Sequence, residues 1–333
     1  NPATYSKDNV PYKPKKYFHI STKGVKEGDF TFIYGFPGRT QEYIHSEGVR
    51  YIEEISDPNK IALRTLRLDI MSRHQAASQK VRIQYSSKHA GVANAWKKWQ
   101  GEVKGLAKMK TVETKKAYEQ AFAKWAKGGE FDGIVEKLDS LYRVQEPYSF
   151  ATDYYNETIR SSEIGNFAMS IARLMGKDNS YDKEKAFKMA ESFFKDYHMP
   201  IDKECFAAMM AEFDRNIPED YKPEYFKQQM RKFKTAEKWA EKLFGKTLFT
   251  VPEKVTSLEA KDRKKVLNDP ATEFYNEFTK WYFNDIKPHM DRLGAELQLA
   301  YRDYMRGQMV YARTQRQQKS FYPDANLTLR VAY

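Results

Sequence analysis

A spacing of three and four between apolar residues constrains this 333-residue sequence more than any other feature. The spacing persists from about Asp57 to Gln318, and it is the period of a helix with one buried face. Residues that end helices interrupt it at Gly128-Gly129, Gly176, Pro200, Pro218, Pro223, Pro252, Pro270 and Pro288. These breaks predict roughly ten helices. Because no fixed-period repeat is visible, we expect a non-repeating helical domain.

The two ends of the sequence have a different, alternating pattern. Aromatic and polar side chains alternate in residues 16–21 and 29–36, with Gly24 and Gly28 between them. This arrangement predicts two strands joined by a turn, and residues 327–333 predict a third strand. A hairpin and a lone strand cannot bury their faces unaided. We therefore expect a mainly α chain in which a multi-helix domain is inserted into a β scaffold that extends beyond this sequence.

The positive charge is concentrated in the first part of the sequence. Residues 1–128 contain 24 Lys and Arg but 12 Asp and Glu, whereas residues 129–333 contain 33 of each, so the net charge of +12 lies in the first part. Solvated faces of long helices explain such lysines. The alternative is a basic helical module that binds nucleic acid or an acidic protein surface, and its binding would depend steeply on salt. A purely structural adaptor is a third reading.

The sequence contains no motif for a metal, a cofactor or a nucleophile. It has no HExxH motif, its six histidines are scattered, and the single Cys205 can form neither an internal disulfide nor a Cys-rich metal site. It has no glycine-rich phosphate loop, and none of its serines is next to a glycine, as a nucleophile elbow requires. We therefore predict no metal site, no cofactor and no catalytic residue in this chain. No apolar run is long enough to span a membrane.

Several segments near the two ends carry a resemblance to a known family. Residues 8–16, 24–30 and 35–40 (GFPGRT), and then 304–307 and 321–330, resemble serine peptidase family 46. This family comprises bacterial dipeptidyl peptidases of the dipeptidyl-peptidase 7 and dipeptidyl-peptidase 11 type. The sequence resembles the central segment of such an enzyme. Since it begins at Asn1 rather than Met, we expect a processed chain or a piece of a longer one.

The resemblance implies a chymotrypsin-like double β-barrel with a Ser-His-Asp triad and an inserted helical domain that covers the cleft. Residues 1–50 would then belong to the barrel, residues 51–318 to the helical lid, and residues 319–333 to the strand that leads into the second barrel. Such enzymes remove dipeptides from the free N-terminus of oligopeptides. The triad would lie outside this sequence, so the segment should be inactive alone.

Partners and location also follow from the resemblance. It implies an oligopeptide substrate, a homodimer of the parent enzyme, no nucleic acid, and a location in the bacterial periplasm or at the cell surface. The residues that choose a hydrophobic or an acidic side chain at the scissile bond are expected in the missing second barrel, so both preferences stay open. We expect the lid to close about hinges near Gly48 and Gln318.

One residue of the helical segment is a candidate for substrate binding. The family uses an asparagine of the helical domain to hold the α-amino group of the substrate, and the resemblance assigns this role to Asn94. The spacing is compatible, because Asn94 lies about 200° around the helix from Val92, on the face opposite the stripe of Trp96 and Trp99. The small neighbours Ser87, Ala90, Gly91 and Gly101 would leave room for a peptide terminus. An ordinary exposed asparagine is the alternative.

Overall fold

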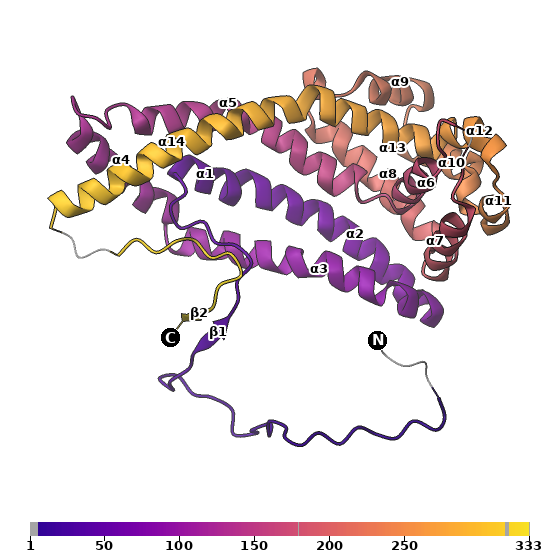
Figure 1. Ribbon diagram of the computed structural model, residues 1–333, viewed down its shortest axis with the longest axis horizontal. Coiled ribbons are helices and arrows are strands. Elements are labelled where there is room, and N and C mark those ends of the chain that lie inside the picture. The colour runs from indigo at the N-terminus through magenta and orange to yellow at the C-terminus, as the bar shows by residue number, and fades with distance from the viewer. Residues whose placement is uncertain (1–5, 179, 317–319, 333) are drawn as a thin grey trace. The chain divides into compact units, whose positions relative to one another are not determined.

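The computed structural model describes residues 6–178, 180–316 and 320–332. These residues are mostly helical, which confirms the mainly α prediction, and they include two short strands (Figure 1). The chain divides into two compact units. The smaller is drawn from Asn1–Glu42 and Tyr322–Tyr333, and the larger is Tyr43–Phe321.

The larger unit has helices but no named strand in its described part. Its α-helices there are α1 (Ser46–Arg50), α2 (Asp57–Ala77), α3 (Gln79–Lys108), α4 (Thr111–Ala126), α5 (Ile134–Tyr154), α6 (Glu163–Arg173), α7 (Lys183–Lys195), α8 (Met199–Asn216), α9 (Glu224–Phe233), α10 (Ala236–Lys246), α11 (Pro252–Thr256), α12 (Arg263–Leu267), α13 (Pro270–Trp281) and α14 (Lys287–Thr314). The π-helical segments are η1 (Tyr51–Ser56), η2 (Tyr155–Ile159) and η6 (Tyr282–Ile286), and the 3₁₀ segments are η3 (Glu219–Tyr221), η4 (Leu248–Thr250) and η5 (Ala260–Asp262).

Most helix breaks lie where Pro and Gly predict them. Gly128-Gly129 separates α4 from α5, and Pro270 starts α13. The break expected at Pro288 is wrong, because α13 continues through η6 into α14 and Pro288 occupies the first turn of α14. Pro288 lies just after the π-helical η6, where the regular i→i−4 hydrogen bonding of the helix is already interrupted. Several breaks were not predicted, among them the extended Ser78 between α2 and α3, and Lys110, with a φ of 49°, between α3 and α4.

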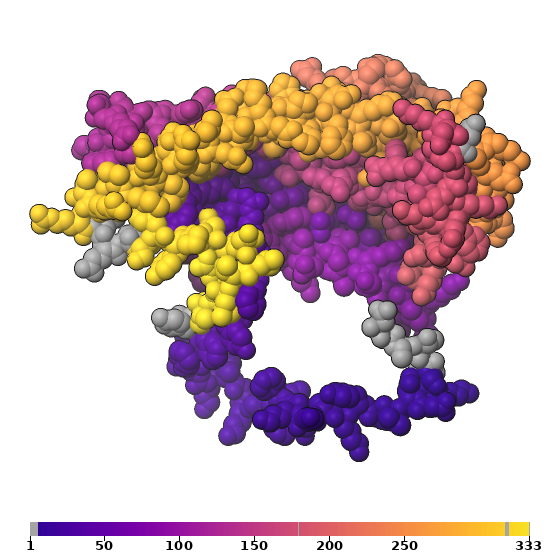
Figure 2. Space-filling model, viewed as in Figure 1, coloured from indigo at the N-terminus to yellow at the C-terminus, as the bar shows by residue number. Residues whose placement is uncertain are grey.

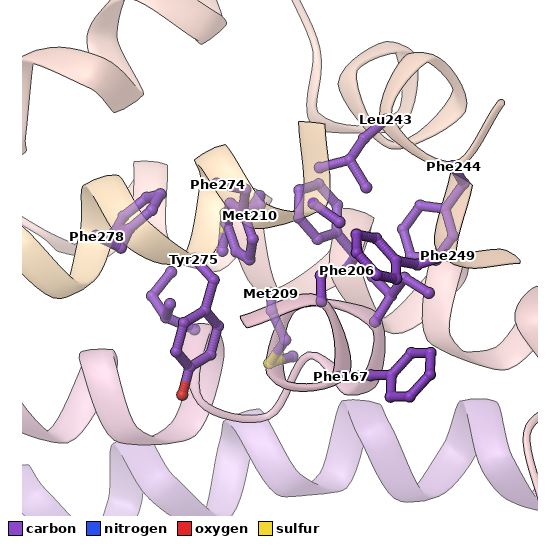
Figure 3. Close-up of a cluster of buried hydrophobic side chains, with 14 of the residues drawn as sticks. Phe167, Phe206, Met209, Met210, Leu243, Phe244, Phe249, Phe274, Tyr275 and Phe278 are labelled. Carbon is purple, nitrogen blue, oxygen red and sulfur yellow. The ribbon is translucent and has the colours of Figure 1, made fainter. Parts of the chain in front are cut away.

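The predicted apolar stripes form most of the core. In the largest cluster Phe206, Phe274 and Phe278 from α8 and α13 are almost fully buried (Figure 3). Their rings meet edge to face, with centroids 4.9 Å apart for Phe206 and Phe274 and 5.3 Å apart for Phe274 and Phe278. A second cluster joins α4, α5 and α14, and a third joins α2, α3 and α8. One stripe residue, Leu66, is exposed instead.

A close approach inside the second cluster depends on a glycine. Helix α14 runs beside α5 (Figure 1) and also contacts α4. A Cβ on Gly307 of α14 would lie 2.7 Å from Cζ of Phe122 on α4, closer than real Cβ contacts allow. Gly307 therefore permits α14 to pack directly against the Phe122 ring.

The strand pairing differs from the prediction. The predicted strand at 16–21 is absent, and the predicted strand at 29–36 shortens to β1 (Ile33–Gly35). β1 does not form a hairpin with an N-terminal neighbour; it pairs antiparallel with β2 (Arg330–Ala332), which lies within the strand predicted at 327–333. The apolar side chains of 16–21 are largely uncovered: Phe18 and Ile20 are fully or almost fully exposed. Figure 2 shows this N-terminal segment (indigo) as a single extended run without a second layer.

Each unit brings distant parts of the sequence together. In the smaller unit the hydroxyl of Thr40 donates to the Asp324 carboxylate at 2.7 Å, next to the β1–β2 pair. In the larger unit the first and last residues, Tyr43 and Phe321, stack with ring centroids 6.0 Å apart. The helical unit therefore begins and ends at one place.

Candidate peptide-binding face

Asn94 lies on α3, a helix of 30 residues that packs along α2 (Figure 1). The side chain of Ser78 caps the first turn of α3. Further along, Val92 is buried and the indole N–H of Trp96 donates to the hydroxyl of Thr65 on α2 at 2.9 Å. The stripe predicted from the spacing therefore does face α2.

Arg64 of α2 fixes the position of α3 through three kinds of contact. Its Nε and Nη2 donate to the two carboxylate oxygens of Glu157 in η2 at 2.8 and 2.9 Å. Its Nη1 donates to the backbone carbonyl of Val92 at 3.0 Å, and its guanidinium lies 4.5 Å from the ring centroid of Trp99. Because Glu157 and Arg64 are largely buried, this ion pair is shielded from solvent. It links α2, α3 and η2 two residues away from Asn94.

Asn94 itself lies on the open face of α3. The residue is exposed, and its amide makes no hydrogen bond with any described residue. Ser87, Ala90, Gly91 and Gly101 are exposed as well, and nothing lies within 4 Å of a Cβ built on Gly91 or Gly101. The position and the surrounding space agree with the expectation, and the amide oxygen is free to accept a hydrogen bond from an ammonium group.

The charge on α3 opposes an ammonium ligand. The helix contains seven Lys and Arg residues but a single acidic residue, Glu102, whose carboxylate is paired with Lys98. Lys97 and Lys98 lie one turn from Asn94. An asparagine offers only a dipole, so a positively charged terminus held here needs a negative group that α3 does not supply.

The described residues do not assemble a metal site or a triad. No group of three His, Cys, Asp or Glu residues among them could hold a metal ion. One serine–histidine hydrogen bond is present, between Oγ of Ser72 and Nε2 of His89 at 3.1 Å. Both residues line a cavity of about 500 Å³ together with Gln79 at the start of α3, and no carboxylate of the described residues bonds to His89 to complete a triad.

A buried polar network near the start of the helical unit was not predicted. Glu119 of α4 accepts hydrogen bonds from the backbone N–H of Ser46 at 2.7 Å and from its hydroxyl at 2.5 Å. Nε2 of His45 lies 3.4 Å from Glu119 and 3.8 Å from Asp139. Burial lowers the pKa of His45 to about 4, and burial raises the pKa of Glu119. The sequence signal that could have indicated this network is the position of Glu119, three residues before the buried Phe122 and therefore on the apolar side of α4.

The comparisons with known proteins agree on one family. The family model described as Peptidase S46 matches residues 1–333. The chain belongs to the peptidase S46 family. An Asp/Glu-specific dipeptidyl-peptidase of Capnocytophaga gingivalis is 33% identical to it over 348 residues, covering 100% of this chain and 48% of the relative. A dipeptidyl-peptidase 7 of Phocaeicola vulgatus is 29% identical, covering 100% of this chain and 47% of the relative.

A solved structure of an S46 relative has a similar fold. Porphyromonas endodontalis DPP11, in complex with the dipeptide Arg-Glu, matches with a TM-score of 0.77 and 27% identity, over 99% of this chain and 48% of that chain. The resemblance to the S46 family is therefore confirmed. This chain spans about half the length of the curated relatives that it matches. The basic binding module gains no support, because these relatives are named as peptidases.

None of the helices within residues 6–178, 180–316 and 320–332 combines the length and the apolar character needed to cross a membrane.

Proposed function

We propose that this chain is the helical segment of a bacterial serine exopeptidase that removes dipeptides from the free N-terminus of oligopeptides. The main support for this proposal is the match to the S46 family along the whole chain. A second support is the crystal structure of a relative with a similar fold, which contains a bound dipeptide. In this proposal the oligopeptide is the partner, acyl transfer occurs at a serine in the remaining half of the parent enzyme, and this segment alone is inactive.

The smaller unit is proposed to be part of a chymotrypsin-like double β-barrel. Phe18 and Phe30 are 102% and 80% exposed, and several other large apolar side chains of residues 10–36 are equally uncovered. Exposed aromatic side chains in extended segments are unfavourable unless another layer covers them. Strands from the remaining half of the parent would provide that layer and would lengthen the short β1–β2 pair.

The larger unit is proposed to act as a lid over the cleft. The hinges would lie at Glu42–Tyr43 and Phe321–Tyr322, where the two units meet along the chain. Gly48 is not suited to the hinge role, since it is buried within α1 and a Cβ there would lie 2.7 Å from the hydroxyl of Tyr142. Gln318 lies outside the described residues.

Asn94 is proposed to accept a hydrogen bond from the α-amino group of the substrate. Support comes from its free amide on an open face and from the resemblance to the family. The net positive charge of α3 means that a carboxylate from outside this chain would have to balance the ammonium group. Such a pair would favour peptides with a free N-terminus over blocked ones.

Kinetics of the full-length parent enzyme test both parts of this proposal. We expect cleavage of a fluorogenic dipeptide amide with a free amino group and none of its N-acetylated form. Asn94→Ala should raise KM about tenfold, since a hydrogen bond to a charged group is lost. Gln100→Ala, an exposed residue of the same helix, is the matched control. No cleavage of the free dipeptide amide would reject the peptidase; equal KM values for Asn94→Ala and Gln100→Ala would reject only the role of Asn94.

Two further proposals rest on the family alone. The parent enzyme is proposed to be a homodimer, which sedimentation of the full-length protein tests. It is also proposed to reside in the periplasm or at the cell surface, as the bacterial relatives allow, and cell fractionation tests this. Its preference for an acidic or a hydrophobic residue at the scissile bond stays open, because the relatives include both an Asp/Glu-specific dipeptidyl-peptidase and a dipeptidyl-peptidase 7.

A further inference from the structure

A cavity of about 290 Å³ opens between α9, α10 and α13. Lys234 and Thr235 alone connect α9 to α10, and Lys234 has a φ of 69°, which turns the chain back sharply. Pro270 and Glu273 of α13 provide the third wall. None of the residues that line the cavity belongs to α2 or α3, so it is distinct from the face around Asn94.

The inner wall of the cavity is aromatic and includes an unused hydrogen-bond donor. Trp239 is only 2% exposed and packs edge to face against Tyr225, with ring centroids 6.1 Å apart. Phe233 and Leu243 complete this wall. The indole N–H of Trp239 donates to no described residue. Its nitrogen is also not one of the fully buried polar atoms without a hydrogen-bond partner, so it is accessible to solvent. Since buried tryptophans normally satisfy this group, the N–H is left for a molecule in the cavity.

The rim of the cavity is positively charged. Lys232, Lys242 and Lys246 line it, and none of the three forms an ion pair with a carboxylate of the described residues. Glu273 is the acidic residue of the lining. Burial and then the negative charge of Glu273 raise the pKa of Tyr225, so its hydroxyl stays protonated and can donate. Donors therefore outnumber acceptors, and the lining carries an excess of positive charge.

We propose that this cavity binds a small organic monocarboxylate with an aromatic or branched apolar group. The carboxylate would lie between Lys242, Lys246 and the indole N–H of Trp239, with charge-assisted hydrogen bonds. The apolar group would lie against Phe233 and Leu243. A volume of about 290 Å³ is at the small end of ligand sites, which suits a molecule of one or two amino-acid residues. Glu273 disfavours a second negative charge.

Calorimetric titration of the full-length parent protein with N-acetylphenylalanine tests this site. The acetyl group removes the free amine that the proposed peptide site requires, so the outcome does not depend on that site. We expect saturable binding, with affinity at least about tenfold lower for N-acetylphenylalanine amide, which lacks the carboxylate, and for acetate, which lacks the apolar group. Absence of binding, or equal binding of the acid and its amide, would overturn the proposal.

Variants locate the binding. Lys242→Gln combined with Lys246→Gln should weaken it at least about tenfold, because both exposed lysines lose their charge without disturbing the core. Lys238→Gln, on the same helix but not in the lining, should leave affinity unchanged. Trp239→Phe keeps the ring but loses the N–H and should also weaken binding. If the lysine pair and Lys238→Gln behave alike, the ligand binds elsewhere and the assignment is wrong.

Discussion

Replacement of Glu157 by glutamine should destabilise the helical unit strongly. The Glu157 carboxylate is 8% exposed and receives two charge-assisted hydrogen bonds from Arg64, at 2.8 and 2.9 Å. Arg67, also largely buried, lies 3.7 Å from the same carboxylate. Glu157→Gln keeps the shape of the side chain but leaves two buried guanidinium groups without a negative partner. Breaking such a pair costs about 3–5 kcal/mol.

Thermal unfolding of the full-length protein measures this cost. A loss of about 3–5 kcal/mol should lower the Tm of the transition that contains the helical unit by about 6 °C or more. Glu184→Gln is the matched control, because its ion pair with Lys188 is 80% and 70% exposed and contributes about 0.5 kcal/mol at most. Equal shifts for Glu157→Gln and Glu184→Gln would refute the claim that the buried pair holds α2 to η2 and positions Arg64 for its contact with α3.

Two other perturbations have defined outcomes. Gly307→Ala should destabilise by about 1–3 kcal/mol, because the added methyl collides with the Phe122 ring, whereas Gly294→Ala in the same helix meets open space and should be neutral or stabilising in denaturant titrations. The pKa of His45 in the folded state is about 4, below its usual 6.5. Because the unfolded chain therefore binds a proton more readily at this residue, the free energy of unfolding is unaffected by His45 above pH 6.5 and falls by up to about 3 kcal/mol as the pH drops towards 4. Since the raised pKa of Glu119 acts in the opposite direction, stability against pH should be compared with that of His45→Gln, and parallel curves would contradict the assignment.

The helices were predictable because their signals are local. Apolar stripes such as Phe274, Phe278 and Trp281 reflect a single buried face, and Pro270 marks a helix start without any knowledge of the tertiary fold. The break at Ser78 was missed because the apolar spacing alone does not show where one helix ends and the next begins. Lys110 was missed because a left-handed lysine has no sequence signature comparable to that of glycine.

Two of the three predicted strands form at nearly the right places, but the pairing between them was not predicted. Alternation identifies an extended segment, yet it does not say which other segment it pairs with. The nearest candidate, residues 16–21, is exposed, and β1 instead pairs with β2 at the far end of the sequence.

The candidate site was only partly accessible from sequence. The exposed position of Asn94 follows from helical geometry, but its role came from the resemblance to the family. The polar anchors Glu157 and His45 were missed because a charged or polar residue on a helix is normally solvated, and only the tertiary fold buries these two. The cavity beside Trp239 depends on three helices meeting and has no pattern along the chain.

The pairing of β1 with β2 has a consequence for the order of folding. The two strands are separated by about 300 residues, whereas a tight hairpin closes over about four. At about 0.6 kcal/mol for each doubling of loop length, closing this loop from an unfolded chain costs roughly 4 kcal/mol more than closing a hairpin. Three residue pairs in a ribbon cannot offset that. Once the helical unit has folded, however, Tyr43 and Phe321 are already stacked, and the intervening chain behaves as a short turn. The helices should therefore form first, and the strands should pair only on that template.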